Sequence, residues 1–228
     1  MFKKLLLTGA LLAAFANISA HAQSSQPFGV TGSIAPPPPT VTIANSGRSD
    51  YGSLSATAVK GYTSSTGIND LYSFPAVALA YSITFSAPTK AALSFTDNHA
   101  GKVLPFDSFD SIRFGVVDTG ATTIGSVAVS LTNTLIDGSP VSVFLSSPTG
   151  TTSWSANTVG GKTGIATNNV GPNYTKAFSK TAGATVPDSF TTLSGNLSMV
   201  LSLKKSLIDT ATTSTTATGS GTFTVVYL

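Results

Sequence analysis

The feature that most constrains the fold is an alternation of large apolar residues with mostly polar ones over residues 193–203, Leu-Ser-Gly-Asn-Leu-Ser-Met-Val-Leu-Ser-Leu. A repeat of two residues puts the large side chains on one face of an extended chain, as in a half-buried β-strand. Shorter extended segments are predicted at residues 79–85, 91–97, 112–117, 125–131 and 141–145. The mature chain shows no 3.6-residue helical repeat. The sequence therefore predicts an all-β fold, a β-sandwich of about seven to eight strands.

Composition agrees with this prediction and excludes some partners. Thr and Ser, which favour strands and turns over helices, number 34 and 32, and there is no Glu. Charged residues make up 9% of the chain, against about 25% in a typical soluble domain. With 41% hydrophobic residues the chain can bury a core. Lys and Arg number 12 against 9 Asp, so we expect no basic patch for nucleic acid.

The N-terminus has the three regions of a secretory signal peptide. Two lysines are followed by an apolar stretch, residues 5–18, and by the small-x-small cleavage site Ala-His-Ala at residues 20–22. We expect residues 1–22 to be removed, residues 23–40 to form an N-terminal extension with a Pro-rich lead-in, and residues 41–228 to form the β-sandwich domain. The rest of the chain has no long apolar run and no Cys. These features predict an exported protein without a membrane anchor or a disulfide.

Turn residues organise the predicted strands. Residues 86–90, Ser-Ala-Pro-Thr-Lys, have the length of a hairpin turn and are predicted to join residues 79–85 to residues 91–97. A second hairpin is predicted from residues 112–117 and 125–131.

The other segments are predicted to be irregular or extended. Residues 148–187 are rich in Gly, Asn, Thr and Ser, so we expect long loops with room for one short strand. The four prolines at residues 36–39 must be extended and cannot lie in a central strand. Residues 211–220 form a Thr/Ser/Gly linker that leads to a last strand at residues 221–228.

One short motif points to an enzyme. Asp118-Thr-Gly-Ala matches the letter pattern around an aspartic-protease carboxylate, where two Asp side chains share one proton. A single-chain enzyme of this type needs a second copy of the motif, and Asp137-Gly-Ser is not one. We therefore interpret Asp118 as part of a polar hairpin tip, with an aspartic protease as the less favoured alternative.

Other chemistry-bearing residues are few. His99 is the only His outside the predicted signal peptide, and it lies in the turn sequence Asp-Asn-His-Ala-Gly. One His, no Cys and scattered Asp residues predict no zinc or calcium site. Ser202 and Lys162 resemble fragments of the penicillin-recognising serine enzymes, but in reversed order. Trp154 is suited either to stacking on a sugar or to packing within the fold. We predict no catalytic residue, no cofactor and no metal.

The C-terminal segment, Gly-Thr-Phe-Thr-Val-Val-Tyr-Leu, carries an apolar comb of Phe223, Val225 and Tyr227. An exposed strand of this kind can be paired by a foreign strand through its free N–H and C=O groups, while pockets accept alternate side chains. The segment is equally consistent with an ordinary final strand in a closed sandwich.

Short motifs also occur in a characteristic order. These are Val-Thr-Gly-Ser-Ile-Ala-Pro at residues 30–36, Asp-Tyr-Gly at 50–52, Ser-Ala-Pro-Thr-Lys at 86–90, Thr-Asp-Asn-His-Ala-Gly at 96–101 and the terminal Val-Val-Tyr-Leu. In this arrangement the chain resembles the proteobacterial family known as domain of unknown function 1120, which is associated with chaperone–usher fimbriae. The resemblance covers nearly the whole mature chain.

The resemblance implies an immunoglobulin-like sandwich of pilin type. It implies that Phe223, Val225 and Tyr227 form the strand bound by a periplasmic chaperone, and that a neighbouring subunit's N-terminal extension later fills the groove. Candidate donor-strand residues are Phe28, Val30 and Ile34; the alternative is a subunit that caps a fibre or does not polymerise. Cysteines of the family fall near Pro39 and Phe85, which are not Cys in this chain.

Together these features predict a secreted, non-enzymatic, fimbrial-subunit-like structural protein. Its expected partners are a periplasmic chaperone, an outer-membrane usher and neighbouring fimbrial subunits. Its expected location is the periplasm in transit and then a cell-surface fimbrium or the extracellular space. The alternative is a freestanding secreted module for adhesion or carbohydrate binding, with Trp154 as the residue that contacts sugar.

Overall fold

The computed structural model describes residues 37–66, 69–106, 110–156, 168–172 and 174–228. These residues belong to one compact unit, Pro37–Leu228. The predicted signal peptide, most of the predicted extension and the candidate donor residues Phe28, Val30 and Ile34 lie outside the described residues.

The described part of the chain is predominantly β, as predicted, and every strand pair in it is antiparallel. The longer strands are β1 (Thr40–Ile43), β4 (Val77–Asp97), β5 (Arg113–Val117), β6 (Thr123–Ile136), β8 (Val143–Pro148), β10 (Tyr174–Ser179), β11 (Ser189–Lys204) and β13 (Gly221–Tyr227). Strands of two or three residues are β2 (Thr63–Ser65), β3 (Leu71–Ser73), β7 (Ser139–Pro140), β9 (Asn169–Val170) and β12 (Thr218–Gly219). The helical elements are α2 (Ala56–Lys60), α3 (Lys205–Asp209) and the 3-10 segments η2 (Ala44–Gly47) and η3 (Asp110–Ile112).

Strand β11 contains the alternating segment on which the prediction of a β fold depends. Leu193 and Leu197 are 1% and 6% exposed, whereas the intervening Ser194 and Asn196 are half-buried on the opposite face. β11 pairs along its length with β4 on one side and with β6 on the other. Gly125 of β6 lies so close to β11 that an added Cβ would overlap the carbonyl oxygen of Ser202, so the glycine is required for this pairing.

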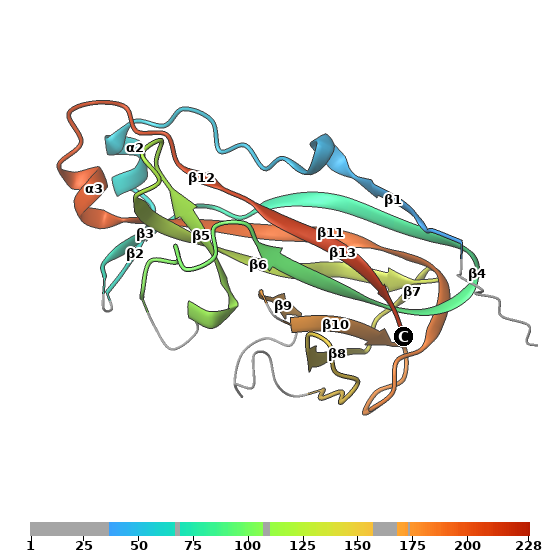
Figure 1. Cartoon of the computed structure of the whole chain (residues 1–228). Coiled ribbons are helices and arrows are strands. Elements are labelled where there is room, and N and C mark those ends of the chain that lie inside the picture. The colour runs from blue at the N-terminus through green and yellow to red at the C-terminus, as the bar shows by residue number, and fades with distance from the viewer. Residues whose placement is uncertain (1–36, 67–68, 107–109, 157–167, 173) are drawn as a thin grey trace, which may run out of the picture. The chain divides into compact units, whose positions relative to one another are not determined.

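Strand β4 is the main departure from the predicted topology. Its first half pairs with β1 and β11, and its second half pairs with β10 and β13. The two halves do not pair with each other, so the predicted hairpin is wrong. Thr89 and Lys90 pair with Phe190 and Ser189 of β11, which keeps these two residues of the predicted turn in an extended ladder. Figure 1 shows that β4 bends back between its first and second halves.

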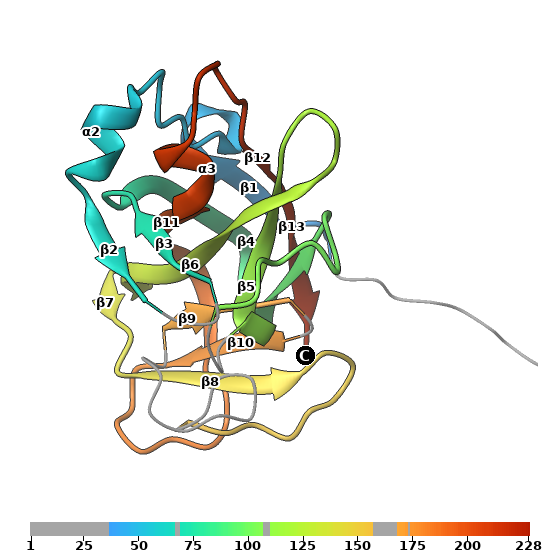
Figure 2. The same cartoon turned by 90° about the vertical axis from the view of Figure 1, so that its left-hand side faces the viewer.

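The bend divides the curled sheet into two parts that enclose one core (Figures 1 and 2). The first part has the order β1–β4–β11–β6–β5, and the second has the order β13–β4–β10–β8. Ile83 from the first half of β4 and Phe178 from β10 are both fully buried in this core. The chain passes from one part to the other between β12, which pairs with β5, and β13.

The Gly/Asn/Thr/Ser-rich region contains a strand with a buried charge-bearing residue. β10 lies between β4 and β8, and an isolated bridge joins Ser146 to Ser155. Lys176 and Phe178, two residues apart on β10, share a face and are both 0% exposed. Because Lys176 is polar although it faces inward, the sequence of β10 does not show the alternation of apolar and polar residues that would predict a strand.

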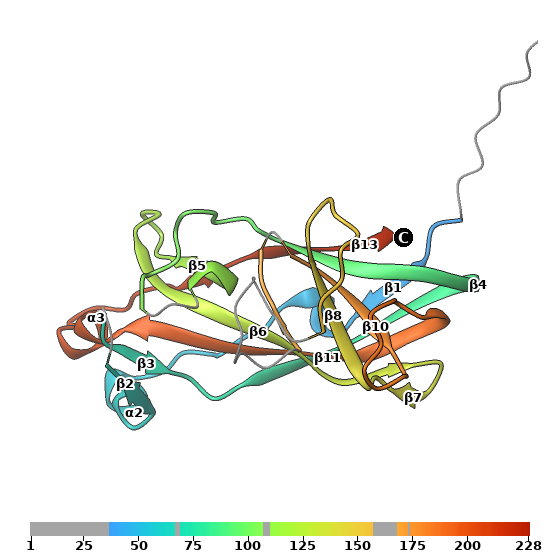
Figure 3. The same cartoon turned by 90° about the horizontal axis from the view of Figure 1, so that it is seen from below.

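The short helices α2 and α3 lie toward the start of β13, and the beginning of β1 lies near its end. α2 starts after Ser55, whose hydroxyl accepts a hydrogen bond from the Ala58 amide as an N-cap. The chain runs from α3 through β12 into β13, and the Tyr227 hydroxyl at the far end donates to the Pro37 carbonyl at 2.7 Å. In Figures 1 and 3, α2 and α3 lie at one end and the start of β1 and the C-terminus lie toward the other.

Candidate functional site at the edges of strands β1 and β13

Strand β13 has one strand partner among the described residues. It pairs with the second half of β4 from Gly221↔Asp97 to Tyr227↔Ala91. The hydrogen bonds from Asn98 to the Ser220 carbonyl and from the Leu228 amide to Lys90 continue this ladder at both ends. Antiparallel ladders bond through alternate residues. The even-numbered residues of β13 therefore bond to β4, and the peptide groups of the odd-numbered residues face the free edge.

The odd-numbered residues of β13 also carry the apolar comb identified in the sequence. Phe223, Val225 and Tyr227 are half-buried and pack against the main core. The Phe223 ring lies 5.4 Å from the Phe95 ring, and the Tyr227 ring lies 5.9 Å from the Phe85 ring, both edge-on. These three residues thus present side chains to the core and peptide groups to the free edge.

Strand β1 supplies a second free edge. It pairs only with β4 among the described residues, with Val41 opposite Ile83. Directly opposed residues in a pair lie on the same face of a sheet, so Val41 points inward. Nevertheless Val41 is 41% exposed while Ile83 is 0% exposed. The described residues therefore cover Val41 only in part, although it lies on the core side of the sheet.

We refer to the free edges of β1 and β13, with the inward-facing residues Val41, Ile43, Phe223, Val225 and Tyr227, as the open edge. The sequences of β1, Thr-Val-Thr-Ile, and β13, Gly-Thr-Phe-Thr-Val-Val-Tyr, contain no charged residue. Recognition at the open edge would therefore depend on main-chain hydrogen bonds and apolar burial. An extended chain with large apolar side chains at every second residue matches both requirements.

The residues of the enzyme motifs have structural partners. The Gly120 and Thr122 amides donate to the Asp118 carboxylate at 2.9 and 2.8 Å, which closes the predicted hairpin turn between β5 and β6. Ser202 lies on β11, where its hydroxyl contacts that of Ser73 at 3.0 Å. Lys162 lies outside the described residues.

His99 and Trp154 are also placed by packing and turns. His99 follows Asp97, whose buried carboxylate accepts hydrogen bonds from the amides of His99 and Gly115, both at 2.9 Å. Trp154 packs against a small buried cluster, Ala92, Leu145 and Ala177, on the outer face of the second part of the sheet. The packing interpretation of Trp154 accounts for its position without a ligand.

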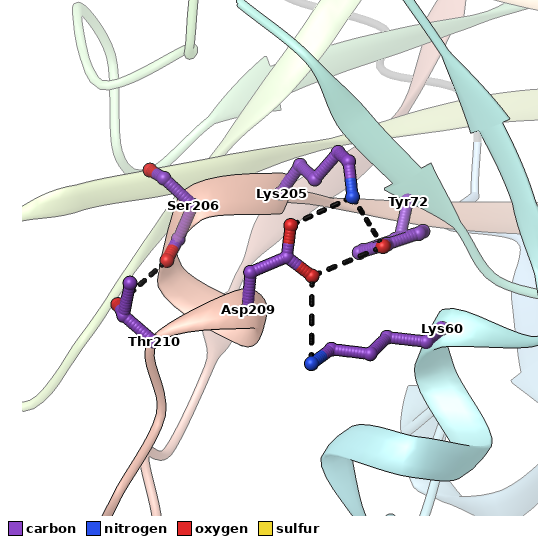
Figure 4. Close-up of polar contacts among 6 residues, drawn as sticks. All are labelled: Lys60, Tyr72, Lys205, Ser206, Asp209 and Thr210. Atoms are coloured by element: carbon purple, nitrogen blue, oxygen red, sulfur yellow. Dashed lines mark hydrogen bonds and ion pairs between the residues drawn. The ribbon is translucent and has the colours of Figure 1, made fainter.

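A polar cluster at the α2–α3 end was missed by the sequence analysis (Figure 4). The Lys205 ammonium lies 2.6 Å from the Asp209 carboxylate and donates to the Tyr72 hydroxyl at 2.5 Å, and Lys60 lies 3.7 Å from Asp209. The hydrogen bond between Lys205 and Asp209 raises the pKa of Lys205 and lowers the pKa of Asp209. The spacing of four residues between Lys205 and Asp209 is the sequence signal that indicates such a pair. The cluster fastens α3 to α2 and β3.

The buried Lys176 was also missed. Its ammonium donates to the Ser146 hydroxyl at 2.5 Å, and burial lowers the pKa of Lys176 to about 7. Both side chains lie within the fold, with Ser146 only 5% exposed, so we place this pair in the interior of the second part of the sheet and not in a binding site.

No protein-family model matches the chain, and the search of curated proteins found no match. In the described ranges, no helix is long and apolar enough to cross a membrane. Over the same residues there is no cluster of three or more His, Cys, Asp or Glu that could hold a metal ion.

Proposed function

We propose that this protein is a secreted, non-enzymatic structural subunit of bacterial surface fibres, of the fimbrial type, which is assembled by strand complementation at the open edge. The observation that carries the proposal is the inward-facing Val41, which is 41% exposed although its cross-strand partner Ile83 is 0% exposed. A foreign strand between β1 and β13 would bury this side chain and pair the free peptide groups of β13. A periplasmic chaperone would supply that strand first, and a neighbouring copy would supply it in the fibre.

The sequence before the described residues provides a matching strand. Phe28, Val30, Gly32 and Ile34 occupy every second position. The seven residues of β13 span about 23 Å, and seven donor residues, 28–34, have the same length. We infer that the donor strand runs antiparallel to β13. All pairs of the described sheet are antiparallel, this pairing is the more stable per residue, and β13 offers a longer edge than β1.

The register of β1 supports the resemblance to the fimbria-associated family and its immunoglobulin-like sandwich. Thr40 lies opposite Thr84 in the β1–β4 pair. One further step along this register sets Pro39 opposite Phe85, the two places near which cysteines of the family fall. Two cysteines at these opposed positions could form a cross-strand disulfide, and this chain has Pro39 and Phe85 there instead.

The direct test uses the mature protein and a synthetic peptide of residues 23–35. At a peptide concentration of about one hundred times Kd, binding stabilises the fold by about 2.7 kcal/mol. For a domain of this size the melting temperature should rise by roughly 5–10 °C. No rise at any peptide concentration would contradict the proposal.

Strand β13 offers a matched pair of variants for this test. Val225 faces the core and Val226 faces the opposite side of the same strand. Val225→Asn should abolish the peptide-induced rise, whereas Val226→Asn should retain it, each measured against its own melting temperature without peptide. Co-expression with a periplasmic chaperone gives a second readout, since removal of residues 221–228 should abolish recovery of soluble protein. Equal recovery with and without these residues would refute the mechanism.

A further inference from the structure

A pocket of about 300 Å³ lies between α2, α3 and the segment that leads to β12, and we call it the α2–α3 pocket. This volume is at the lower end of the range for small-ligand sites. One wall is aliphatic and includes Leu54, Val59, Leu207 and Ile208. The other wall is the Thr-Thr-Ser-Thr segment at residues 212–215.

The second wall is rich in hydrogen-bond donors that the described residues do not use. None of the four hydroxyl groups of residues 212–215 takes part in a hydrogen bond with the described part of the chain, and their peptide groups are equally unpaired there. The opposite wall leaves Leu54 41% exposed. Lys60 and Lys205 both pair with Asp209, and none of these three charged residues lines the pocket. The pocket therefore suits an uncharged, apolar segment that carries hydrogen-bond acceptors.

The direction of β13 determines which segment of a neighbouring copy would reach this pocket. β13 starts six residues after Thr215 and ends where Tyr227 bonds to Pro37 (Figures 1 and 3). A donor strand antiparallel to β13 runs from the Pro37 end toward the α2–α3 end. The residues that follow Ile34 in the donor copy would therefore emerge at the α2–α3 end of the acceptor copy.

We propose that the α2–α3 pocket binds the proline run, residues 36–39, of a second copy of this chain; the inference rests on the proposed function. A proline run has no N–H donors, carries carbonyl acceptors and presents apolar rings; because the Pro37 carbonyl accepts from Tyr227 of its own chain, the contact would use the carbonyls of the neighbouring prolines. These properties are the complement of the donor-rich and aliphatic walls of the pocket. Four prolines in an extended left-handed helix span about 12 Å. Pro37 and Pro38 are exposed in their own chain, so their rings are free to make this contact.

The contact can be measured by comparing two peptides on the mature protein. The peptide of residues 23–40 contains the donor strand and the proline run, and the peptide of residues 23–35 contains the donor strand alone. We expect the longer peptide to bind at least tenfold more tightly in isothermal titration calorimetry. Ser214→Trp, which fills the pocket without touching the open edge, should remove this difference and leave the affinity of the shorter peptide unchanged.

The outcomes separate this inference from the proposed function. Equal affinities of the two peptides for the unmodified protein would overturn the inference and leave strand complementation intact. Failure of both peptides to bind would overturn both. A persistent tenfold difference in the Ser214→Trp protein would place the proline contact elsewhere and also overturn the inference.

Cross-linking tests the same contact between whole chains. The chain has no Cys, so a double variant with Pro38→Cys and Thr213→Cys can form disulfides only between introduced residues. These residues lie at opposite ends of β13, so we expect a ladder of multimers on non-reducing gels. The matched control, Pro38→Cys with Val186→Cys, places the second thiol at a 59% exposed site outside the pocket and should give no ladder. If the Pro38→Cys and Thr213→Cys protein forms multimers but shows no disulfide-linked ladder, or if the control shows the same ladder, the inference would also be overturned.

Discussion

The buried Lys176 should make the protein more stable as the pH rises above neutrality. Burial lowers the pKa of Lys176 from 10.5 to about 7. Between these values the unfolded chain binds more protons than the folded chain, so the free energy of unfolding increases with pH. Below pH 7 the amine is charged in both states, and the full cost of burying that charge remains.

The size of the effect follows from the shift in pKa. A lowering from 10.5 to about 7 corresponds to about 5 kcal/mol at low pH. Lys176→Met removes this cost but leaves the Ser146 hydroxyl without its lysine donor, which costs about 1–3 kcal/mol. We expect Lys176→Met to be more stable than the unmodified protein by about 3 kcal/mol at pH 6 and less stable than it by about 1 kcal/mol at pH 10, where the charge cost has largely gone and the loss at Ser146 remains.

Urea unfolding at pH 6, 7, 8, 9 and 10 tests this prediction, with the midpoint and slope fitted for each protein. Lys180→Met is the matched control, because the Lys180 side chain is 41% exposed and lies 3.9 Å from the Asp137 carboxylate. Its stability should differ from that of the unmodified protein by less than about 0.5 kcal/mol at each pH. Parallel curves for Lys176→Met and the unmodified protein from pH 6 to pH 10 would refute the reasoning.

Three further predictions concern the sheet. Gly125→Ala should destabilise the protein by about 3 kcal/mol or more in urea unfolding, because its Cβ would overlap a carbonyl oxygen of β11. Asp137→Asn should destabilise it by about 1–3 kcal/mol at pH 7, since the Asp137 carboxylate accepts hydrogen bonds from two amides of β11 at 2.9 and 3.0 Å. Desolvation raises the pKa of Asp137, but these bonds lower it overall, so the difference should disappear as the pH falls below 3.8. The double variant Pro39→Cys with Phe85→Cys should form a disulfide that makes its oxidised form about 4 kcal/mol more stable than its reduced form; free thiols after mild oxidation would contradict the β1–β4 register.

The sequence predicts strands that have a clear alternation of apolar and polar residues, but it predicts only part of how these strands pair with one another. β11, and the hairpin of β5 and β6, follow from local patterns and short turns. The bend in β4 was mistaken for a hairpin because Pro88 and its neighbours have turn composition. The extended conformation at this position depends on the pairing of Lys90 with Ser189, which is nearly one hundred residues away in the sequence. A local sequence pattern cannot predict such a contact.

The open edge was partly visible in the sequence. The comb of Phe223, Val225 and Tyr227 follows from alternation alone, but whether its edge is free depends on which strand lies beside it. Val41 lies in a four-residue strand whose inward face can be assigned only from its pairing with Ile83. The α2–α3 pocket was not predictable, because helices of five residues leave no periodic signal and its second wall reads as a linker.

Both borders of the open edge are attached to a single strand, since β1 pairs with the first half of β4 and β13 with its second half. The position of β1 relative to β13 along the open edge is therefore set by the number of residues in the bend of β4, because the two borders cannot shift independently. One residue inserted in that bend would displace Phe223, Val225 and Tyr227 relative to Val41 by about 3.3 Å. An insertion in the Thr/Ser segment before β12 would leave the two borders in register.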